Sequence, residues 1–341
     1  MIGKNIRYYR QMKKMSQAEL ARRLNVARMT VSHYENGERT PDYDTMQRLA
    51  VVLEVPLAAL SVTYGAIPQI EHGAFRAQKS MTRDEQEYIL TCADRYLSRL
   101  FQVVSFLGDA ALTAAPILQR VAVQTPEQAA AHLRTLLGLP MTGPVGNITD
   151  MLENKGFIVC PVDVPESKFS GNSGYANGRP YITVNTTMPA ERQRFTLIHE
   201  LAHLVFVFEE GQDEEKLVDQ IAGAFLLPAE DILRELGARR TSIISDLRLV
   251  QREYGIAMQT VAIRARQTGI ISQDVYTQTQ KWFSAKGYRK NEQSGLIPED
   301  NHLLEQLTIR AVAEDEISVS KAAELLQVPL VQARKLCFGG V

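Results

Sequence analysis

The sequence is poor in cysteine and has no long run of apolar residues. Its three cysteines, Cys92, Cys160 and Cys337, are scattered among 341 residues and show no metal-ligand spacing. This odd number excludes a full disulfide framework and predicts free thiols in a reducing compartment. No apolar stretch is long enough for a membrane span, and the N-terminus lacks the apolar core of a signal peptide. We therefore expect a cytoplasmic protein without a membrane partner.

Charge is distributed unevenly along the chain. The net charge is −1, but residues 1–65 hold ten Lys and Arg against six Asp and Glu, a net +4, which leaves −5 for the remainder. A basic N-terminal region, called the head below, is followed by an acidic remainder. This distribution predicts that only the head binds a polyanion. Hydrophobic residues make up 45% of the chain and charged residues 23%, as in a globular protein of two or three domains.

Residues 2–60 predict five short helices. Ser16 and Glu19 form a capping box before the second helix, and Gly37 is well placed to end the third. The turn of about three residues between these two helices is typical of a helix-turn-helix. Gln17 could then donate to a DNA phosphate, while the exposed face of the third helix offers side chains to base edges. Those side chains are Arg28, Met29, Thr30, Ser32 and His33. The alternative is a small helical packing domain that never contacts DNA.

The stretches 16–26 (SQAELARRLNV) and 31–37 (VSHYENG) resemble the Xre/Cro-type repressors. The resemblance implies that Gln17 contacts phosphate and that Arg28, Met29 and His33 face base edges. It also implies a homodimer on a double-stranded DNA operator with half-sites one turn apart. Ala27 departs from the family's usual Ser or Thr cap at the start of the recognition helix.

The middle of the chain predicts a connector followed by mixed structure. Residues 67–79 lack periodicity and are expected to form a linker, and Thr82 with Glu85 caps a helix that runs to Gly108. Residues 157–162 and 181–185 have β character, and the Gly-rich stretch 170–178 between them predicts a hairpin or an exposed edge.

Residues 195–208 predict a helix that is apolar almost all round, yet it contains His199, Glu200 and His203. Polar groups on a buried helix cost stability unless each has a partner. Because residues i and i+4 share a helix face, the two histidines can hold one cation with Glu200 beside them. The alternative, a pair of satisfied core histidines, does not account for the carboxylates that follow.

Two carboxylates four residues apart follow on the next predicted helix. Glu215 can supply a third metal ligand, and Asp219 can accept a hydrogen bond from a ligand imidazole. Glu214 competes as the third ligand but has no Asp or Asn four residues on. Two histidines, one carboxylate and an open fourth position are typical of catalytic zinc, whereas a closed structural site favours Cys and His ligands.

Such a zinc site predicts peptide hydrolysis. Zinc lowers the pKa of its water to roughly 7 and polarises a carbonyl, and Glu200 could take the water proton and pass it to the leaving amine. The strand 181–185, or the edge before it, could pair with an extended substrate. Tyr175 and Tyr181 are candidate oxyanion donors.

The ordered motifs 181–185 (YITVN), 192–203 (RQRFTLIHELAH), Glu215 with Asp219, and 225–228 (FLLP) resemble the ImmA/IrrE metallopeptidases. The resemblance covers about residues 125–235. It implies a gluzincin-like domain, a zinc cofactor and cleavage of an Xre-type repressor, as in regulators that fuse both halves on one chain.

We therefore expect a mostly α protein with a small β-sheet (α+β) in four parts. These are a helix-turn-helix head (1–65), a helical connector (66–124), a metallopeptidase domain (125–275) and a helical C-terminal region (276–341). Within the C-terminal half, residues 245–268 and 319–336 predict two helix pairs, which we expect to pack within the protein more than to contact nucleic acid. Residues 282–299 are expected to form a loop-like hinge.

The leading hypothesis is a DNA-binding regulator whose zinc endopeptidase cleaves a repressor, either itself or a partner. One alternative is a non-catalytic regulator whose HExxH pocket only binds metal or a small ligand. Another is an antitoxin-like protein of a two-gene module that acts by protein–protein contact.

Overall fold

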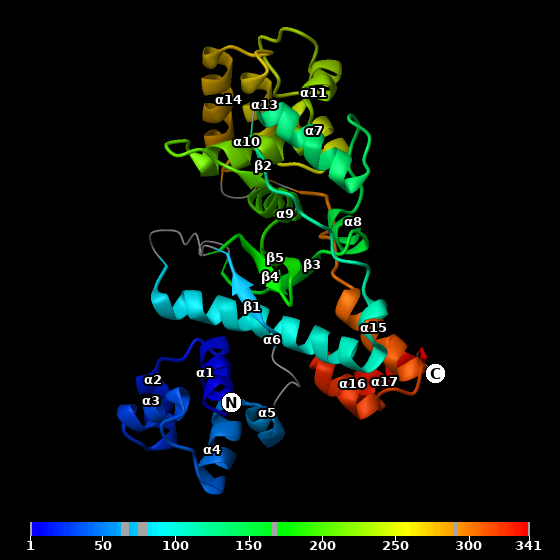
Figure 1. The fold of residues 1–341 in the computed structure, drawn as a ribbon. Helices are drawn as coiled ribbons and strands as arrows, with labels where there is room; N and C mark the ends of the chain where they lie inside the picture. Colours follow the sequence, from blue (N-terminus) through cyan, green and yellow to red (C-terminus); the bar gives the residue numbers. More distant parts are fainter. Residues whose placement is uncertain are drawn as a thin grey trace. The chain divides into compact units, whose positions relative to one another are not determined.

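The computed structural model describes residues 2–62, 68–73, 81–123, 125–165, 169–289, 292 and 294–339. The chain divides into two compact units, residues 1–67 with 82–98, and residues 68–81 with 99–341 (Figure 1). Helices dominate both units and a small mixed sheet lies in the second, so the predicted α+β class is confirmed.

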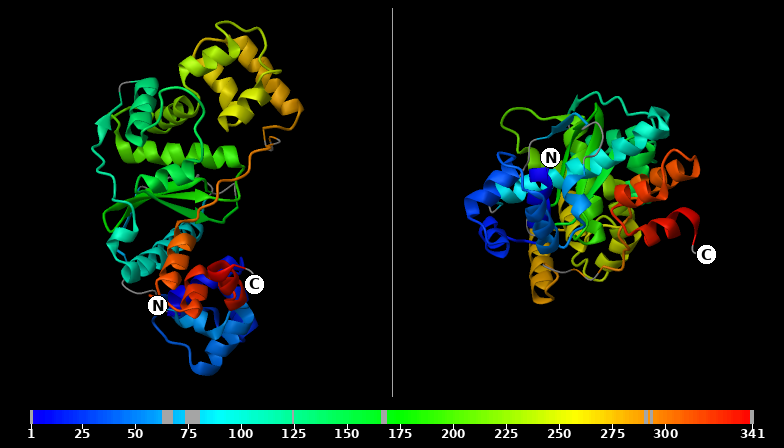
Figure 2. Two further views of the ribbon diagram at one scale, coloured as in Figure 1. Left: turned by 90° about the vertical axis from the view of Figure 1, so that its right-hand side faces the viewer. Right: turned by 90° about the horizontal axis from the view of Figure 1, so that it is seen from below.

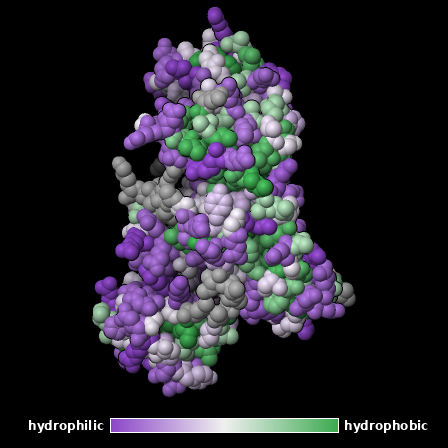
Figure 3. Space-filling view, in the orientation of Figure 1, coloured by the Kyte–Doolittle hydropathy of each residue, from purple (hydrophilic) through white to green (hydrophobic). Residues whose placement is uncertain are grey.

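The face of the protein shown in Figure 3 is largely polar. On the face shown in Figure 3, apolar side chains gather in small separate patches among hydrophilic ones. Among the described helices, none combines the length and hydrophobicity that a bilayer crossing requires.

The first unit is a cluster of short helices around one apolar core. Ser16 begins the second helix by accepting a hydrogen bond from the Glu19 amide at 3.1 Å, which confirms the predicted cap. Ile6, Leu20 and Leu49 are fully buried in the core. The helices are α1 (Ile2–Met12), α2 (Gln17–Leu24), α3 (Arg28–Asn36), α4 (Tyr43–Leu53), α5 (Leu57–Ser61) and the first part of α6 (Arg83–Leu107).

A buried ion pair joins α1 to α3 in this unit. The Arg10 guanidinium donates to both carboxylate oxygens of Glu35, at 2.5 and 3.0 Å, and to the Met15 carbonyl at 2.7 Å. The side-chain amide of Gln17 donates to the same carboxylate at 2.9 Å. Charge and hydrogen bonds are therefore matched within this cluster, as a buried pair requires.

The second unit contains the sheet and most of the helices. Its strands are β1 (Ile70–His72), β2 (Val121–Ala122), β3 (Ile158–Val162), β4 (Gly171–Ala176), β5 (Arg179–Asn185) and β6 (Phe206–Val207). Its helices are the short 3-10 helix η1 (Asp109–Ala111), α7 (Pro126–Leu137), α8 (Ile148–Asn154), α9 (Ala190–Val205), α10 (Glu214–Leu226), α11 (Ala229–Leu236), α12 (Leu247–Tyr254), α13 (Met258–Gln267), α14 (Gln273–Ala285), α15 (Leu303–Ala313), α16 (Val319–Leu326) and α17 (Leu330–Phe338).

The main sheet has the strand order β1-β4-β5-β3. β4 is antiparallel to both of its neighbours, and β5 is parallel to β3. α9 packs against one face of this sheet and α10 packs against α9 (Figures 1 and 2). Val159 and Ile182 point from that face into the core that they share with Leu197 and Leu201 of α9.

The expectation of a plain linker over residues 67–79 is wrong in its described part. Residues 70–72 form β1, which pairs with β4, and residues 67 and 74–79 of the stretch lie outside the described residues. No local pattern predicts this strand, because its partner lies about a hundred residues further along the chain.

The expected loop over residues 282–299 is also partly wrong, because α14 continues to Ala285. The chain that follows is held at two helix N-termini. Glu292 accepts hydrogen bonds from the Met258 and Gln259 amides of α13 at 2.7 and 3.0 Å. Glu299 accepts from the Ile148 and Thr149 amides of α8 at 2.8 and 2.9 Å. A helix N-terminus attracts carboxylates, so these contacts attach the segment to the domain and argue against a hinge.

Candidate metal centre

α9 leaves one narrow stripe of its surface accessible. Twelve of its sixteen residues are buried, and the four that are not, Arg192, Phe195, His199 and His203, follow each other at intervals of three or four. This spacing places them on one face of the helix. The other residues of the helix are buried, the apolar ones in the core, so both histidines open on the same side.

The histidines and Glu215 converge on one point. The Nε2 atoms of His199 and His203 lie 3.1 Å apart. The Glu215 carboxylate lies 3.4 Å from the first Nε2 and 3.6 Å from the second. One ligand atom from each of the three residues can be chosen so that all three atoms lie within 4.8 Å of one another. The structure thus brings together the three side chains predicted as ligands.

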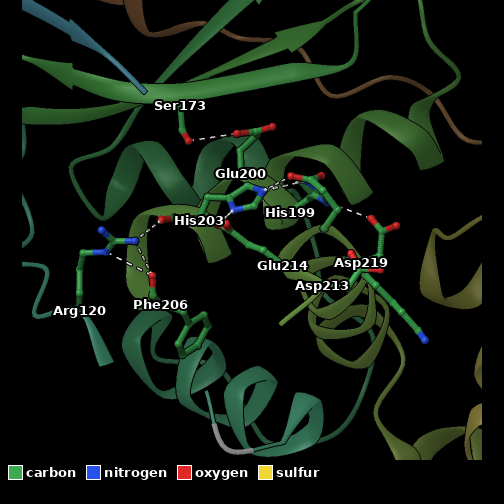
Figure 4. A network of polar contacts seen from close by, with 11 residues as sticks. Arg120, Ser173, His199, Glu200, His203, Phe206, Asp213, Glu214 and Asp219 are labelled. Atoms are coloured by element: carbon green, nitrogen blue, oxygen red, sulfur yellow. Dashed lines mark hydrogen bonds and ion pairs between the residues drawn. The ribbon is translucent and has the colours of Figure 1, made fainter. Parts of the chain in front are cut away.

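Each histidine has an acidic partner on its other ring nitrogen (Figure 4). Asp219 lies 2.9 Å from Nδ1 of His199, and Glu214 lies 3.1 Å from Nδ1 of His203. Since a carboxylate only accepts, each Nδ1 carries the proton and each Nε2 presents a lone pair. Two lone pairs and the Glu215 carboxylate therefore face each other, an arrangement that a cation stabilises, and the donor set fits zinc.

The position of Glu214 was missed by sequence reasoning, which considered it only as a competing metal ligand. Glu214 and Glu215 are adjacent on α10, so their side chains point in different directions. One contacts the outer nitrogen of His203, and the other faces both Nε2 atoms. A spacing argument on a single helix could not separate these two positions.

The acidic surroundings affect the protonation of His199. Burial lowers the pKa of this imidazole, but the hydrogen bond with Asp219 and the charges of Glu200, Asp219 and Glu215 together outweigh burial. The pKa of His199 is therefore raised above its usual value. The acidic groups around this ring therefore favour a positive charge at the site, which a metal ion held by the two Nε2 lone pairs would supply.

Glu200 is held from the sheet. It is 9% exposed, and the Ser173 hydroxyl of β4 donates to its Oε2 at 3.0 Å (Figure 4). Gly171 allows this close approach, because a Cβ there would lie 2.4 Å from the Thr196 side chain of α9 and 3.2 Å from Cγ of Glu200. Ser173 was not singled out in the sequence, because the pairing depends on how β4 crosses α9.

Two cavities adjoin the centre. One of about 480 Å³ is lined by His199, Glu200 and Glu215. The other, of about 350 Å³, is lined by Glu200, His203 and Tyr175. Tyr175 therefore lies where an oxyanion donor could act.

Tyr181, the second tyrosine suggested for this role, is placed elsewhere. It is fully buried, and its hydroxyl contacts Nδ1 of His72 at 2.6 Å. Its strand neighbour Ile182 faces α9, so Tyr181 points to the opposite face of the sheet.

In the head, α3 presents the predicted base-reading residues to differing extents. Arg28 is exposed and Met29 is 64% exposed, whereas Thr30, Ser32 and His33 are half-buried. Ala27 is the N-cap of α3 and makes no side-chain capping bond. The Gln17 amide, to which a phosphate contact is assigned, donates to Glu35.

Comparisons with known proteins agree with this division. Residues 6–60 match the helix-turn-helix family model, and residues 158–266 match the model of the IrrE N-terminal-like domain, which is classed among the peptidases. The chain is 35% identical over 57 residues to the HTH-type transcriptional regulator YqaE of Bacillus subtilis strain 168. That match covers 17% of this chain and 49% of the relative, so it spans about half of that protein's length. The chain therefore joins an Xre-like helix-turn-helix domain to an IrrE N-terminal-like peptidase domain.

Proposed function

We propose that the protein is a cytoplasmic transcriptional regulator whose second unit is a zinc-dependent endopeptidase that cleaves a repressor, either itself or a partner. One observation carries the proposal, namely the convergence of two Nε2 lone pairs and the Glu215 carboxylate beside Glu200. A structural core would not assemble these groups without a compensating charge.

His199, His203 and Glu215 would hold the ion, with Asp219 and Glu214 fixing the two rings. Bound zinc supplies Lewis-acid activation of water and of the scissile carbonyl. The Glu200 carboxylate accepts the proton of the attacking water and returns it to the leaving amine. The Ser173 hydroxyl holds Oε2 of Glu200, so the carboxylate is oriented before substrate arrives. Tyr175 is the candidate donor to the developing oxyanion.

The head would bind a double-stranded DNA operator as a homodimer. Arg28 and Met29 are the most exposed members of the predicted base-reading set, with Thr30, Ser32 and His33 beside them. Gln17 would contact phosphate at the start of α2. Cleavage of a repressor would remove DNA-bound protein and thereby switch transcription.

Glu200→Gln in the full chain tests the catalytic part. The variant keeps the shape of the side chain but cannot act as a base. We expect it to bind one zinc ion per chain, measured by elemental analysis, and to retain operator affinity. Cleavage of itself or of a co-encoded Xre-type repressor should fall by about 10²–10⁴-fold. Equal cleavage by variant and wild type would overturn the role of Glu200.

A wild-type protein that binds zinc but cuts neither itself nor such a repressor would contradict the endopeptidase proposal. A protein that binds no zinc would contradict the metal site itself. These two outcomes are separated by measuring metal content and cleavage on the same preparation.

A further inference from the structure

β1 pairs with β4, the strand whose Ser173 donates a hydrogen bond to the candidate catalytic carboxylate, Glu200. Its residues Ile70, Glu71 and His72 pair antiparallel with Ala176, Tyr175 and Gly174 of β4. Two backbone bonds extend the ladder. The Asn177 amide donates to the Gln69 carbonyl at 2.8 Å, and the Gly73 amide donates to the Ser173 carbonyl at 2.9 Å.

Ser173 connects this ladder to the centre. Its carbonyl accepts from Gly73, and its hydroxyl donates to Glu200 at 3.0 Å. The cavity of about 350 Å³ shows the same proximity, because Glu71, His72 and Gly73 line it together with Glu200 and His203. β1 therefore ends beside the carboxylate that would activate water.

The backbones of β1 and β4 approach closely at the C-terminal end of β1. A Cβ on Gly174 would lie 2.3 Å from the Glu71 carbonyl oxygen, and a Cβ on Gly73 would lie 2.4 Å from the Ser173 carbonyl oxygen. On the far face of the sheet, His72 contacts the Tyr181 hydroxyl at 2.6 Å. Both the backbone and one side chain thus fix β1 in this register.

Peptidases and other peptide-binding proteins take extended chains by adding a strand to a sheet edge. The edge of β4 is suited to this because its backbone groups lie next to Glu200. In an antiparallel ladder, bonded pairs alternate, so bonds at 69/177 and 73/173 place a third bonded pair at 71/175. β1 uses the backbone groups that a polypeptide substrate would need.

We propose that β1 occupies part of the substrate edge, so that this strand competes with an extended polypeptide for β4. The inference rests on the proposed peptidase function of this centre. Because β1 has only three strand residues, the bonds to be replaced are few and a substrate strand can displace it. Release of β1 would then control access to the edge of β4 beside Glu200.

The test compares two glycine variants of the full-length, zinc-loaded chain in the Glu200→Gln background, in which a bound polypeptide is not consumed. Gly73→Val places a side chain against the Ser173 carbonyl and should release β1. Gly295→Val is the matched control, since a Cβ there meets nothing within 4 Å. The probe is a reduced, carboxymethylated and fluorescently labelled protein, which is an extended polypeptide. Binding is followed by fluorescence anisotropy.

We expect Gly73→Val to bind the probe about tenfold more tightly than Gly295→Val. The substitution removes a competing strand, and a tenfold change in affinity corresponds to about one net hydrogen bond between β1 and β4. Hydrogen exchange at the Tyr175 amide, bonded to β1 in the proposed register, should accelerate in the same variant. Glu71→Pro, which removes the donor of the central pair, should have the same two effects and serves if Gly73→Val does not fold.

Faster exchange with unchanged probe affinity would overturn the inference, because β1 would be released without opening a binding edge. The inference would also be overturned if Gly73→Val and Glu71→Pro both left the exchange of the Tyr175 amide and the affinity for the probe unchanged. If the probe binds more tightly but the Glu200-containing protein never cleaves a polypeptide, the proposed hydrolysis fails while the role of β1 stands.

Discussion

The two units each contain a buried or half-buried cluster of charged and polar side chains, and the clusters differ in balance. In the head, Arg10 supplies donors to both oxygens of Glu35, and Gln17 adds another. At the metal centre, carboxylates lie on the outer nitrogens of His199 and His203 while the inner nitrogens face each other. The first cluster contains its own counter-charge, and the second gathers lone pairs toward a common point. The comparison teaches that balance within a polar cluster, more than its burial, distinguishes a structural network from a ligand site.

The largest expected effect is on the balanced cluster. Glu35→Ala leaves the Arg10 guanidinium buried without its carboxylate, and loss of one partner of a buried pair costs about 3–5 kcal/mol. We expect the head to lose this much unfolding free energy, measured by urea denaturation of the full chain. Glu38→Ala, at an exposed position next to α3, is the control and should change stability by less than about 0.5 kcal/mol. A loss of similar size in both variants would show that the pair is not special.

At the candidate metal centre, substitution of a carboxylate should weaken metal binding and leave stability nearly unchanged. Asp219→Asn removes the carboxylate that orients His199, and loss of such a partner typically weakens metal binding by about 10–100-fold. The stability of the metal-free protein should hardly fall, because the change also relieves the crowding of acidic groups. Asp213→Asn, which alters charge at the N-cap of the same helix, is the matched control for a zinc titration. Equal zinc affinity in the two variants would mean that Asp219 does not support the site.

The head and the C-terminal helix pair α16–α17 should differ in their contribution to DNA binding. Arg28→Ala should weaken operator binding by about 1–3 kcal/mol, as expected for an arginine that reads a base edge. Arg334→Ala, on α17, should leave affinity within error, because that pair is expected to serve packing. Electrophoretic mobility shifts at fixed salt measure both. A larger effect at Arg334 would move the DNA-binding surface away from α3.

A last expected effect concerns a carboxyl that has a neutral partner. Burial, followed by the nearby charge of Asp150, raises the pKa of Glu153 to about 8, although Asn301 donates a hydrogen bond to it. The folded state therefore holds this proton more tightly than the unfolded state. Its contribution to stability is complete below the ordinary glutamate pKa and is lost as pH rises through about 8.

Glu153→Gln should accordingly flatten the pH dependence of unfolding between pH values of about 5 and 8. The measurement is the difference in unfolding free energy between wild type and variant at each pH. A difference that stays constant across this range would show that Glu153 does not titrate there.

Sequence reasoning succeeded where the determining contacts are local. The cap of α2 at Ser16 depends on residues three apart, and so does the Thr82–Glu85 box, in which each residue binds the other's amide. The alignment of His199 with His203 likewise follows from one turn of helix. These features need no knowledge of the rest of the fold.

It failed where partners are distant in the chain. β1 shows little alternation of its own and becomes a strand by pairing with β4. Ser173 meets Glu200 only because β4 crosses α9. The placement of Tyr181 away from the centre likewise depends on its register in the sheet. Long-range pairing leaves no local pattern, and these are the parts of the site that the sequence could not supply.

The two carboxylates that follow α14 have a practical consequence for where the peptidase unit ends. The family match stops at residue 266, yet Glu292 and Glu299 provide the N-terminal hydrogen bonds of α13 and α8. A fragment trimmed to the matched boundary would leave those amides exposed and would strip Arg194 of its ionic partner. The smallest autonomous fragment of this domain must therefore retain a tail that no motif marks.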